Sequence, residues 1–485
     1  MRRSPDRTPP ALLHRAAPLA TVCAALLLQA CAQLPELAES PPLRTAQSFQ
    51  SSASLHAPVA DWPSDKWWTG YGDSQLNALI DEALANAPDL QAAQARLQRA
   101  QALTQISGSS LKPQISANAA ISQDKLSNNY LTPPSMTPQD WNDYGRVTLD
   151  FSWELDFWGK NRAALAAATS ELEAGRAELA QTRLLLASSI AANYAELSRL
   201  YANHATTVQS VEIRQQTAAL FARRFEHGLE TKGSVREADA RRAATEGSLL
   251  ALDEQIALQR NRLAALLGAG PDRGLSIAIP SLKLDHSFGL PEQLSVNLLG
   301  RRPDVVAARL QAEAQARRIE QKKAEFYPNV NLSAFVGVQA LGLDLLSKSG
   351  SGVGSIGPAI SLPLFTGGRL QGELRGTHAG YAETVANYNA TVARALQEVA
   401  DAAVSQKALG QRLQKAQETV DAASESYQVA RNRYEGGLAN YLEVLTAQDG
   451  MLTSQSALTN LRSQSFTQDI ALQRALGGGY QLAQR

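Results

Sequence analysis

Three carboxylates lie in one short stretch of the sequence: Asp150, Glu154 and Asp156. Closely spaced carboxylates can act as a general acid and base, or they can attract cations. The three positions differ by even numbers of residues, and in a β-strand such positions share one face. If that face borders water, cation attraction is favoured over acid catalysis. We therefore expect these carboxylates to set a cation preference.

The segment that carries these carboxylates, residues 146–157, alternates between polar and apolar side chains. This period of two predicts a β-strand with one charged face and one apolar face. The apolar face consists of large side chains, which suits a tilted membrane strand between lipid and a wet lumen. Trp158 follows where an interfacial aromatic residue would lie. The apolar side chains are Val147, Leu149, Phe151, Trp153, Leu155 and Phe157.

Other patterns that could carry chemistry are weak. Gly352-x-Gly354-x-x-Gly357 matches the spacing of a dinucleotide fingerprint, but Pro358 follows it in place of a helix, which favours a hairpin loop. The histidines are scattered and the cysteines are not paired, so no metal site is indicated. We expect no catalytic residues, no bound cofactor and no metal, and an enzyme is the least supported class.

Composition narrows the class of protein further. The chain has 485 residues and a formal net charge of zero, which argues against nucleic acid as a partner because phosphate binding needs a basic face. No apolar run reaches the roughly 18 residues that a transmembrane helix needs. If the chain crosses a membrane, strands must therefore do so.

The first 30 residues have the pattern of an export signal. Four arginines precede an apolar run, and Leu28-Gln-Ala then leads to Cys31. This order predicts a lipoprotein signal peptide at 1–30, with Cys31 becoming the acylated N-terminus. The alternative is an ordinary signal peptide in which Cys31 is incidental. Residues 31–60 are rich in Pro, Ser and Ala, which predicts a tether.

The second half of the sequence repeats the order of elements in the first: helix, strand, loop, strand, long helix, break and helix. Pro88-Asp89 matches Pro303-Asp304, and Arg224-Phe-Glu-x-Gly228 matches Arg433-Tyr-Glu-x-Gly437. This self-similarity predicts a duplication. The predicted ranges are about 61–270 for the first repeat, 271–302 for a linker, 303–480 for the second repeat and 481–485 for a tail. Strands are expected at about 114–121, 146–157, 329–338 and 355–364, and the long helices at about 159–225 and 367–433.

Each repeat offers two strands, so one chain has too few to close a barrel, for which membrane proteins use about eight or more. An open sheet edge is not stable in lipid. The barrel must therefore be shared between subunits, and the long helices must pack side by side into a tube. Leu165, Leu172 and Leu179 recur every seven residues, the spacing of coiled-coil packing. A barrel continued by a helical tube is a conduit.

Several motifs, in this order, resemble the outer-membrane efflux proteins (TolC-like), in the lipoprotein branch typified by OprM and NodT. The resemblance implies a mostly α-helical homotrimer with a 12-stranded membrane β-barrel that is continued by a 12-helix periplasmic α-barrel. It also implies a periplasmic adaptor and an inner-membrane pump, commonly of the proton-driven RND type. The motifs are Trp67-Trp68-x-x-Tyr71-x-Asp73, Trp153-Glu-Leu-Asp156, Arg301-Arg-Pro-Asp304, Ser361-Leu-Pro-Leu-Phe365 and Ala475-Leu-Gly-Gly-Gly-Tyr480.

The same resemblance implies a periplasmic gate just after the second helical break. Members of the family carry acids at positions that match Glu443 and Thr446, and here Asp449 lies one turn further on. The gate is therefore expected to involve Glu443, Asp449, Tyr434 and Thr446. Three carboxylates meeting on a three-fold axis would repel one another, raise one another's pKa and attract cations. The alternative is that Glu443 and Asp449 are solvated helix charges.

Aromatic residues gather at the expected strand–helix junctions. We interpret Phe157, Trp158, Phe326, Tyr327 and Phe365 as a membrane-interface belt, and generic packing at a corner is the alternative. The sequence thus predicts a passive outer-membrane channel subunit that exports small molecules. A channel for type I protein secretion and a periplasmic coiled-coil scaffold are the alternatives, and the alternating strands argue against the scaffold.

Overall fold

The computed structural model describes residues 34–50, 53–55, 57–127, 129, 133–284, 288–292 and 294–481. The predicted signal peptide at 1–30, the proposed acylation site Cys31 and residues 482–485 lie outside the described residues. The chain forms two units, each built from both halves of the sequence. One, the sheet unit, includes residues 99–173 and 310–386. The other, the helical unit, contains residues 43–98, 174–309 and 387–485.

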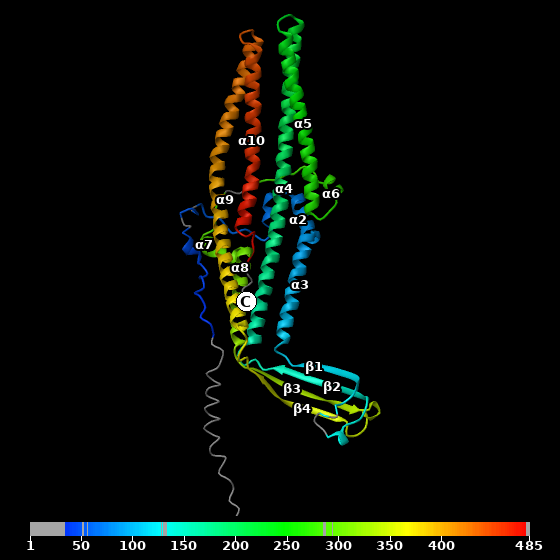
Figure 1. The fold of residues 1–485 in the computed structure, drawn as a ribbon. Helices are drawn as coiled ribbons and strands as arrows, with labels where there is room; N and C mark the ends of the chain where they lie inside the picture. Colours follow the sequence, from blue (N-terminus) through cyan, green and yellow to red (C-terminus); the bar gives the residue numbers. More distant parts are fainter. Residues whose placement is uncertain are drawn as a thin grey trace, which may run out of the picture. The chain divides into compact units, whose positions relative to one another are not determined.

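Most of the described chain is helical, and its sheet is small (Figure 1). None of the described helices is both long and apolar enough to cross a membrane. The α-helices are α2 (Ser74–Asn86), α3 (Pro88–Ser109), α4 (Lys160–Glu226), α5 (Lys232–Leu266), α6 (Asp272–Leu275), α7 (Leu294–Arg301), α8 (Pro303–Ala324), α9 (Arg369–Glu435) and α10 (Tyr441–Ala475). The strands are β1 (Gln114–Asp124), β2 (Asn142–Glu154), β3 (Asn329–Leu341) and β4 (Gly352–Ser361), and short 3₁₀ turns include η2 (Trp67–Tyr71).

The helix lengths support the duplication. Helices α4 and α9 have 67 residues each, α5 and α10 have 35 each, and α3 and α8 have 22 each. The starts of α5 and α10 also match, because Thr231 and Asn440 each accept a hydrogen bond from the backbone N–H three residues ahead. Such N-caps satisfy backbone donors that a first helical turn leaves unpaired, so each long helix breaks at a defined residue.

The sheet is antiparallel, with strand order β1-β2-β3-β4. Its register places Leu149 opposite Ala117 on one side and Val336 on the other, so apolar positions of neighbouring strands share a face. Strand β2 begins before the predicted residue 146, because its pairing with β1 continues to Asn142 in the β1–β2 hairpin. It ends before the predicted residue 157, because its pairing with β3 stops at Glu154, opposite Asn331. Strand β4 ends at Ser361 instead of Leu364, two residues before Pro363, which has no N–H to donate.

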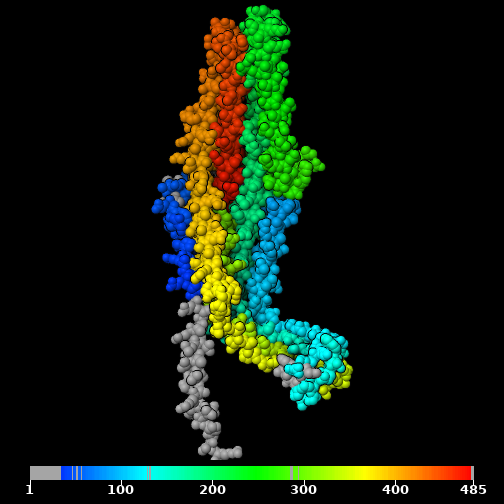
Figure 2. Space-filling model, in the orientation of Figure 1, coloured from blue at the N-terminus to red at the C-terminus, as the bar shows by residue number. Residues whose placement is uncertain are grey.

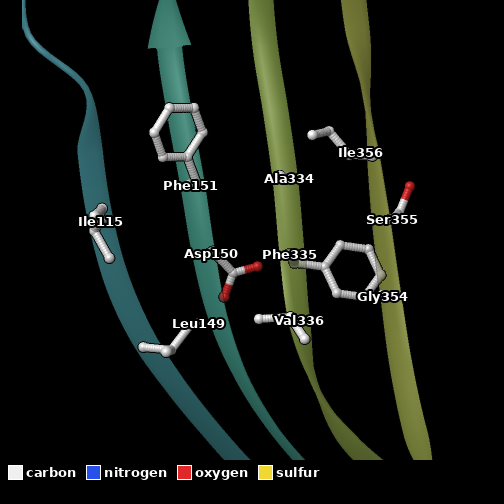
Figure 3. Close-up of a pocket in the computed structure, with 10 residues that line it drawn as sticks. All are labelled: Ile115, Leu149, Asp150, Phe151, Ala334, Phe335, Val336, Gly354, Ser355 and Ile356. Carbon is white, nitrogen blue, oxygen red and sulfur yellow. The ribbon is translucent and has the colours of Figure 1, made fainter.

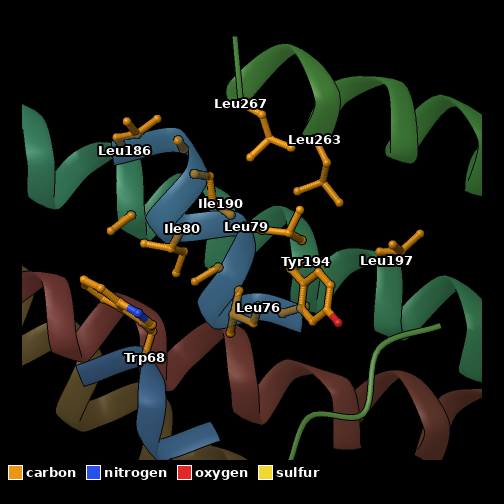
Figure 4. Close-up of a cluster of buried hydrophobic side chains, with 14 of the residues drawn as sticks. Trp68, Leu76, Leu79, Ile80, Leu186, Ile190, Tyr194, Leu197, Leu263 and Leu267 are labelled. Carbon is orange, nitrogen blue, oxygen red and sulfur yellow. The ribbon is translucent and has the colours of Figure 1, made fainter. Parts of the chain in front are cut away.

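The core of the helical unit surrounds α2. Asp73 caps this helix by accepting hydrogen bonds from the N–H groups of Gln75 and Leu76. Buried side chains from α2, α4 and α5 pack beside the aromatic turn η2 (Figure 4). The Tyr194 hydroxyl donates to Asp73 at 2.9 Å. This core fixes α2 against α4 and α5; its members include Trp68, Tyr71, Leu76, Leu79, Ile80, Ile190, Tyr194, Leu197, Leu263 and Leu267.

Within the helical unit, the α4–α5 hairpin (green) and the α9–α10 hairpin (orange to red) lie side by side (Figures 1 and 2). Each hairpin turns at a short break, at residues 227–231 and 436–440. Gly228 and Gly437 occupy equivalent positions in these breaks and both have positive φ, which favours glycine. We call the two breaks and the adjoining helical turns the tip.

Candidate functional site

One face of the sheet exposes a continuous apolar surface. Leu149, Val336 and Ile356 come from three neighbouring strands and are 54%, 63% and 78% exposed (Figure 3). Exposed apolar area of this extent is costly in water, at about 25 cal/mol per Å², whereas lipid would cover it at no such cost. The observed register therefore supports the prediction of a membrane strand, with lipid against this face.

The opposite face of the sheet is polar, but its carboxylates are not equivalent. Asp150 accepts hydrogen bonds from Asn118 Nδ2 and from the Thr148 hydroxyl, both at 2.8 Å. Glu154, the last residue of β2, forms an ion pair with Lys160 Nζ at 2.5 Å. Asp150 is therefore held by neutral groups, whereas the charge of Glu154 is balanced by a lysine.

The prediction of a lumen-facing strand carboxylate is wrong for Asp156. It lies beyond β2, where its carboxylate accepts from the N–H groups of Asn161 and Arg162 at the start of α4. It also forms an ion pair with the Arg162 side chain at 3.2 Å. The strand ends two residues too soon for the alternation to apply, and a carboxylate near a helix N-terminus is stabilised by the unpaired N–H groups there.

The aromatic residues of the predicted membrane-interface belt divide into exposed and buried side chains. Trp158 stacks on Tyr327 with ring centroids 4.8 Å apart and donates its indole N–H to the Pro328 carbonyl at 2.9 Å. Phe157 is also exposed, and Phe365 is 92% exposed, as an interfacial residue would be in the absence of lipid. The prediction is wrong for Phe326, which is 2% exposed and packs against Leu370 and Leu374.

At the tip, the two hairpins share a buried cluster. Phe221 of α4 lies 5.2 Å from the ring of Tyr434 in α9, measured between centroids. Val444 and Leu445 of α10 are buried in the same cluster. The ends of the two hairpins are therefore packed against each other at the tip, because apolar side chains from both hairpins form one buried cluster.

Tyr434, a predicted gate residue, links the two hairpins. Its hydroxyl donates to Glu230 Oε2 at 2.6 Å, and the guanidinium of Arg224 lies 4.5 Å from its ring centroid. Arg224 also donates to the backbone carbonyl of Tyr434 at 3.3 Å. Burial and the Glu230 carboxylate raise the pKa of Tyr434, so its hydroxyl remains a donor at neutral pH.

Asp449 makes a second link between the hairpins. It accepts from Arg214 of α4 at 2.7 Å and also from Arg241 of α5, so two cations share one carboxylate. Nearby, Gln448 is fully buried and donates to the Thr217 hydroxyl at 2.8 Å. Among the predicted gate residues, Tyr434 and Asp449 are those that bridge the hairpins of one chain.

Glu443 and Thr446 lie elsewhere on α10. Both are exposed, and Glu443 forms an ion pair with Arg433 of its own hairpin at 3.4 Å. They line a shallow groove between α9 and α10 together with Val429 and Leu442. Their exposure leaves Glu443 free to meet copies of itself across a symmetry axis, and that ring remains a prediction.

Sequence reasoning missed the partners of the gate residues: Glu230, Arg214 and Arg241. Glu230 lies two residues after the glycine of the repeated Arg-Phe-Glu-x-Gly motif, so the repeat itself placed it at the first break. No comparable local signal exists for Arg214 and Arg241, which lie inside helices among many other arginines. In the described residues, no cluster of three or more His, Cys, Asp or Glu side chains could hold a metal ion.

Comparison with known proteins identifies the family that has this architecture. The family model described as outer membrane efflux protein matches residues 79–269 and 294–478. The fusaric acid resistance protein FusA of Burkholderia cepacia is 36% identical over 75% of this chain and 69% of its own length. The multidrug resistance outer membrane protein MdtP of Escherichia coli (strain K12) is 30% identical over 90% of each chain.

A solved structure agrees with these relatives. The crystal structure of the outer membrane protein VceC from Vibrio cholerae superposes with a TM-score of 0.83 at 48% identity, covering 87% of this chain and all of that one. Both halves of the sequence are matched by the family model, as the duplication requires. The chain belongs to the outer membrane efflux protein family and is an outer-membrane channel of the kind that serves efflux pumps.

Proposed function

We propose that three copies of this chain form a passive conduit that exports small molecules across the outer membrane. The open edges of the sheet support this assembly, because β1 and β4 each have a single neighbour among the described strands. Backbone groups at such edges need partners in lipid. Three four-stranded sheets joined edge to edge give twelve strands, and the four long helical hairpin arms of each chain give a twelve-helix tube. We propose that the conduit works without a catalytic site and without a cofactor.

We propose that the tip is the gate. The observation that carries this proposal is the pair of polar links between the hairpins, Tyr434 to Glu230 and Asp449 to Arg214 and Arg241. A closed iris requires the α9–α10 hairpin to be held inward against the α4–α5 hairpin, and breaking these links would release it. Glu443, exposed on α10 and paired with Arg433, would add a ring of three carboxylates that attracts cations to the closed gate.

The partners are proposed on the same basis. Leu229 and Leu438 are exposed in the two breaks, and a helical hairpin of a periplasmic adaptor could dock on this end of the tip. Docking there would act on the hairpin that carries Tyr434 and Asp449. We propose that an inner-membrane pump, of the RND type, supplies the energy for export through the passive conduit.

We propose that the mature chain is anchored by a lipid on Cys31. The Leu-Gln-Ala-Cys order at residues 28–31 supports this. The anchor is tested by mass spectrometry of the membrane-extracted protein, in which the N-terminal peptide should carry acyl chains that Cys31→Ser lacks. An unmodified Cys31 in the wild-type protein would reject the anchor while leaving the channel unaffected.

The conduit and its gate are tested together by single-channel recording of the purified full-length protein in a planar bilayer. We expect a small, mostly closed conductance for the wild type and more frequent opening for Glu443→Ala, because the variant lacks the ion pair between Glu443 and Arg433 at the tip. The matched control is Glu418→Gln, which removes an exposed carboxylate that pairs within α9, with Lys415 and Gln414.

The outcomes separate the parts of the proposal. An unchanged pore in Glu443→Ala, with the control also unchanged, would remove Glu443 from the gate and keep the conduit. Equal opening in the variant and in Glu418→Gln would show a general charge effect. Failure of every variant and of the wild type to conduct would reject the conduit.

A further inference from the structure

On the polar face of the sheet, the aromatic side chain of Phe335 lies beside a cation. The guanidinium carbon of Arg146 lies 5.0 Å from the ring centroid of Phe335. Arg146 belongs to β2 and Phe335 to β3, and Figure 3 shows Phe335 next to Asp150 of the neighbouring strand. Alternation places all three on the face opposite to Leu149 and Val336, which is the face that would line a lumen.

The register explains how the pair meets. Arg146 is opposite Gln339, Thr148 is opposite Gly337 and Asp150 is opposite Phe335, so the arginine must reach along the sheet past Gly337. Gly337 has no side chain to obstruct it, and a Cβ there would collide with the backbone of Val147 and Thr148. The glycine therefore both permits the close strand pairing and leaves the space above it open.

The guanidinium of Arg146 lies over the ring of Phe335, and among the described residues it attracts the Asp150 carboxylate without forming an ion pair with it. Asp150 shares the face, but its carboxylate is bonded to the neutral groups of Asn118 and Thr148. Glu154 and Asp156, expected to favour cations, are paired with Lys160 and Arg162. The polar face thus presents a guanidinium next to an aromatic surface.

We infer that Arg146 and Phe335 form a binding subsite in the channel wall for aromatic anions. The carboxylate of such a solute would accept hydrogen bonds from the guanidinium, which presents donors in a planar fork. Its ring would pack on Phe335, and such aromatic pairs prefer offset or edge-to-face contact over a simple apolar one. This inference rests on the proposed trimeric conduit, in which three copies of the subsite surround the lumen.

The test measures how benzoate and cyclohexanecarboxylate reduce the open-channel current of the full-length protein in potassium chloride. Both probes carry one carboxylate, and only benzoate has an aromatic ring. We expect the wild type to be half-blocked by benzoate at a concentration about two- to tenfold lower than by cyclohexanecarboxylate. Phe335→Leu should remove this difference, and Arg146→Gln should weaken block by both probes.

The control variant is Lys348→Gln, which removes an exposed cation that pairs with Asp344 outside the strands. It should keep the wild-type response to both probes. Equal block by the two probes in the wild type, or a preference for benzoate that survives in Phe335→Leu, would overturn the subsite. Normal potassium chloride currents in these variants would show that the conduit still stands, whereas absent currents in the wild type would mean that the conduit itself has failed.

Discussion

The hydroxyl of Tyr434 lies 2.6 Å from a carboxylate oxygen of Glu230, although 204 positions separate the two residues in the sequence. Tyr434 lies in the last turn of α9 and Glu230 in the break before α5, so one hydrogen bond joins the ends of two hairpins. Hydrogen bonds to charged groups contribute more than neutral ones, about 1.5–3 kcal/mol. The bond is therefore a direct constraint on how far the hairpins can separate.

Tyr434→Phe should loosen the tip. The substitution keeps the ring that packs on Phe221 and removes the hydroxyl, which leaves Glu230 without this donor. We expect a higher open fraction in single-channel recordings and greater entry of large polar antibiotics into cells that carry the variant. Tyr427→Phe is the matched control, because the Tyr427 hydroxyl contacts Gln448 within its own hairpin. Equal behaviour of the two variants would argue against a specific role for the Tyr434 hydroxyl.

Acid should also weaken this link. Burial alone would raise the pKa of Glu230, but hydrogen bonds from Tyr434, the Thr231 N–H and Ser234, together with the charge of Arg224, hold that pKa below its usual value. Ionised Glu230 therefore stabilises the closed tip at pH values above the ordinary glutamate pKa of about 4.3. This stabilisation is lost as the pH falls through the lowered pKa that Glu230 has in the closed tip. We expect channel opening to increase below about pH 4.

Glu230→Gln isolates the contribution of this carboxylate from that of the other carboxylates at the tip. The variant should open more readily at neutral pH and show a smaller further increase on acidification. An acid response as large as that of the wild type would assign the pH dependence to other groups.

Asp449→Asn should weaken the second link. A neutral amide keeps one acceptor for Arg214 but loses its charge attraction to Arg214 and Arg241. Because Asp449 is partly exposed, solvent and salt screen the interaction, and we expect a cost of about 1 kcal/mol. That energy corresponds to roughly a fivefold change in the ratio of open to closed channels. Higher salt should raise opening in the wild type and have less effect in the variant.

The differences between Asp150, Asp156 and Asp449 show what the sequence could predict. Alternation is a local pattern, so the residues of one strand were enough to predict Asp150 on the polar face of β2. Strand length is set by pairing with β3, which comes from the other half of the sequence and ends the ladder before Asp156. The partners of Asp449 are 235 and 208 positions away, and no periodicity within one helix points across such a separation.

The buried arginine of the Arg301-Arg-Pro-Asp304 motif should matter for folding more than for gating. Arg302 donates to Asp304 and to Glu398 of α9, both at 2.7 Å, and to the Ala475 carbonyl at the end of α10. Burial would lower its pKa, but the two carboxylates raise it, so the guanidinium stays charged. Arg302→Leu would leave two half-buried carboxylates unpaired, which costs about 3–5 kcal/mol.

The measurement is thermal unfolding of the purified protein, with Arg317→Leu as the control. Arg317 is exposed and pairs with Glu320 one turn away, so its loss should change stability by less than about 0.5 kcal/mol. A small effect of Arg302→Leu would mean that Asp304 and Glu398 find other partners or solvent.

The orientation of the sheet can be tested with one residue on each face. Leu149 lies near the middle of β2 on the apolar face, and Ser333 is exposed on the polar face of β3. An arginine on the lipid side of a membrane strand costs about 2–4 kcal/mol near the bilayer centre, whereas the lumen side is wet. Leu149→Arg should therefore reduce the amount of assembled protein recovered from outer membranes, and Ser333→Arg should leave that amount unchanged. The reverse result would exchange the two faces, and with them the placement of Arg146 and Phe335 in the lumen.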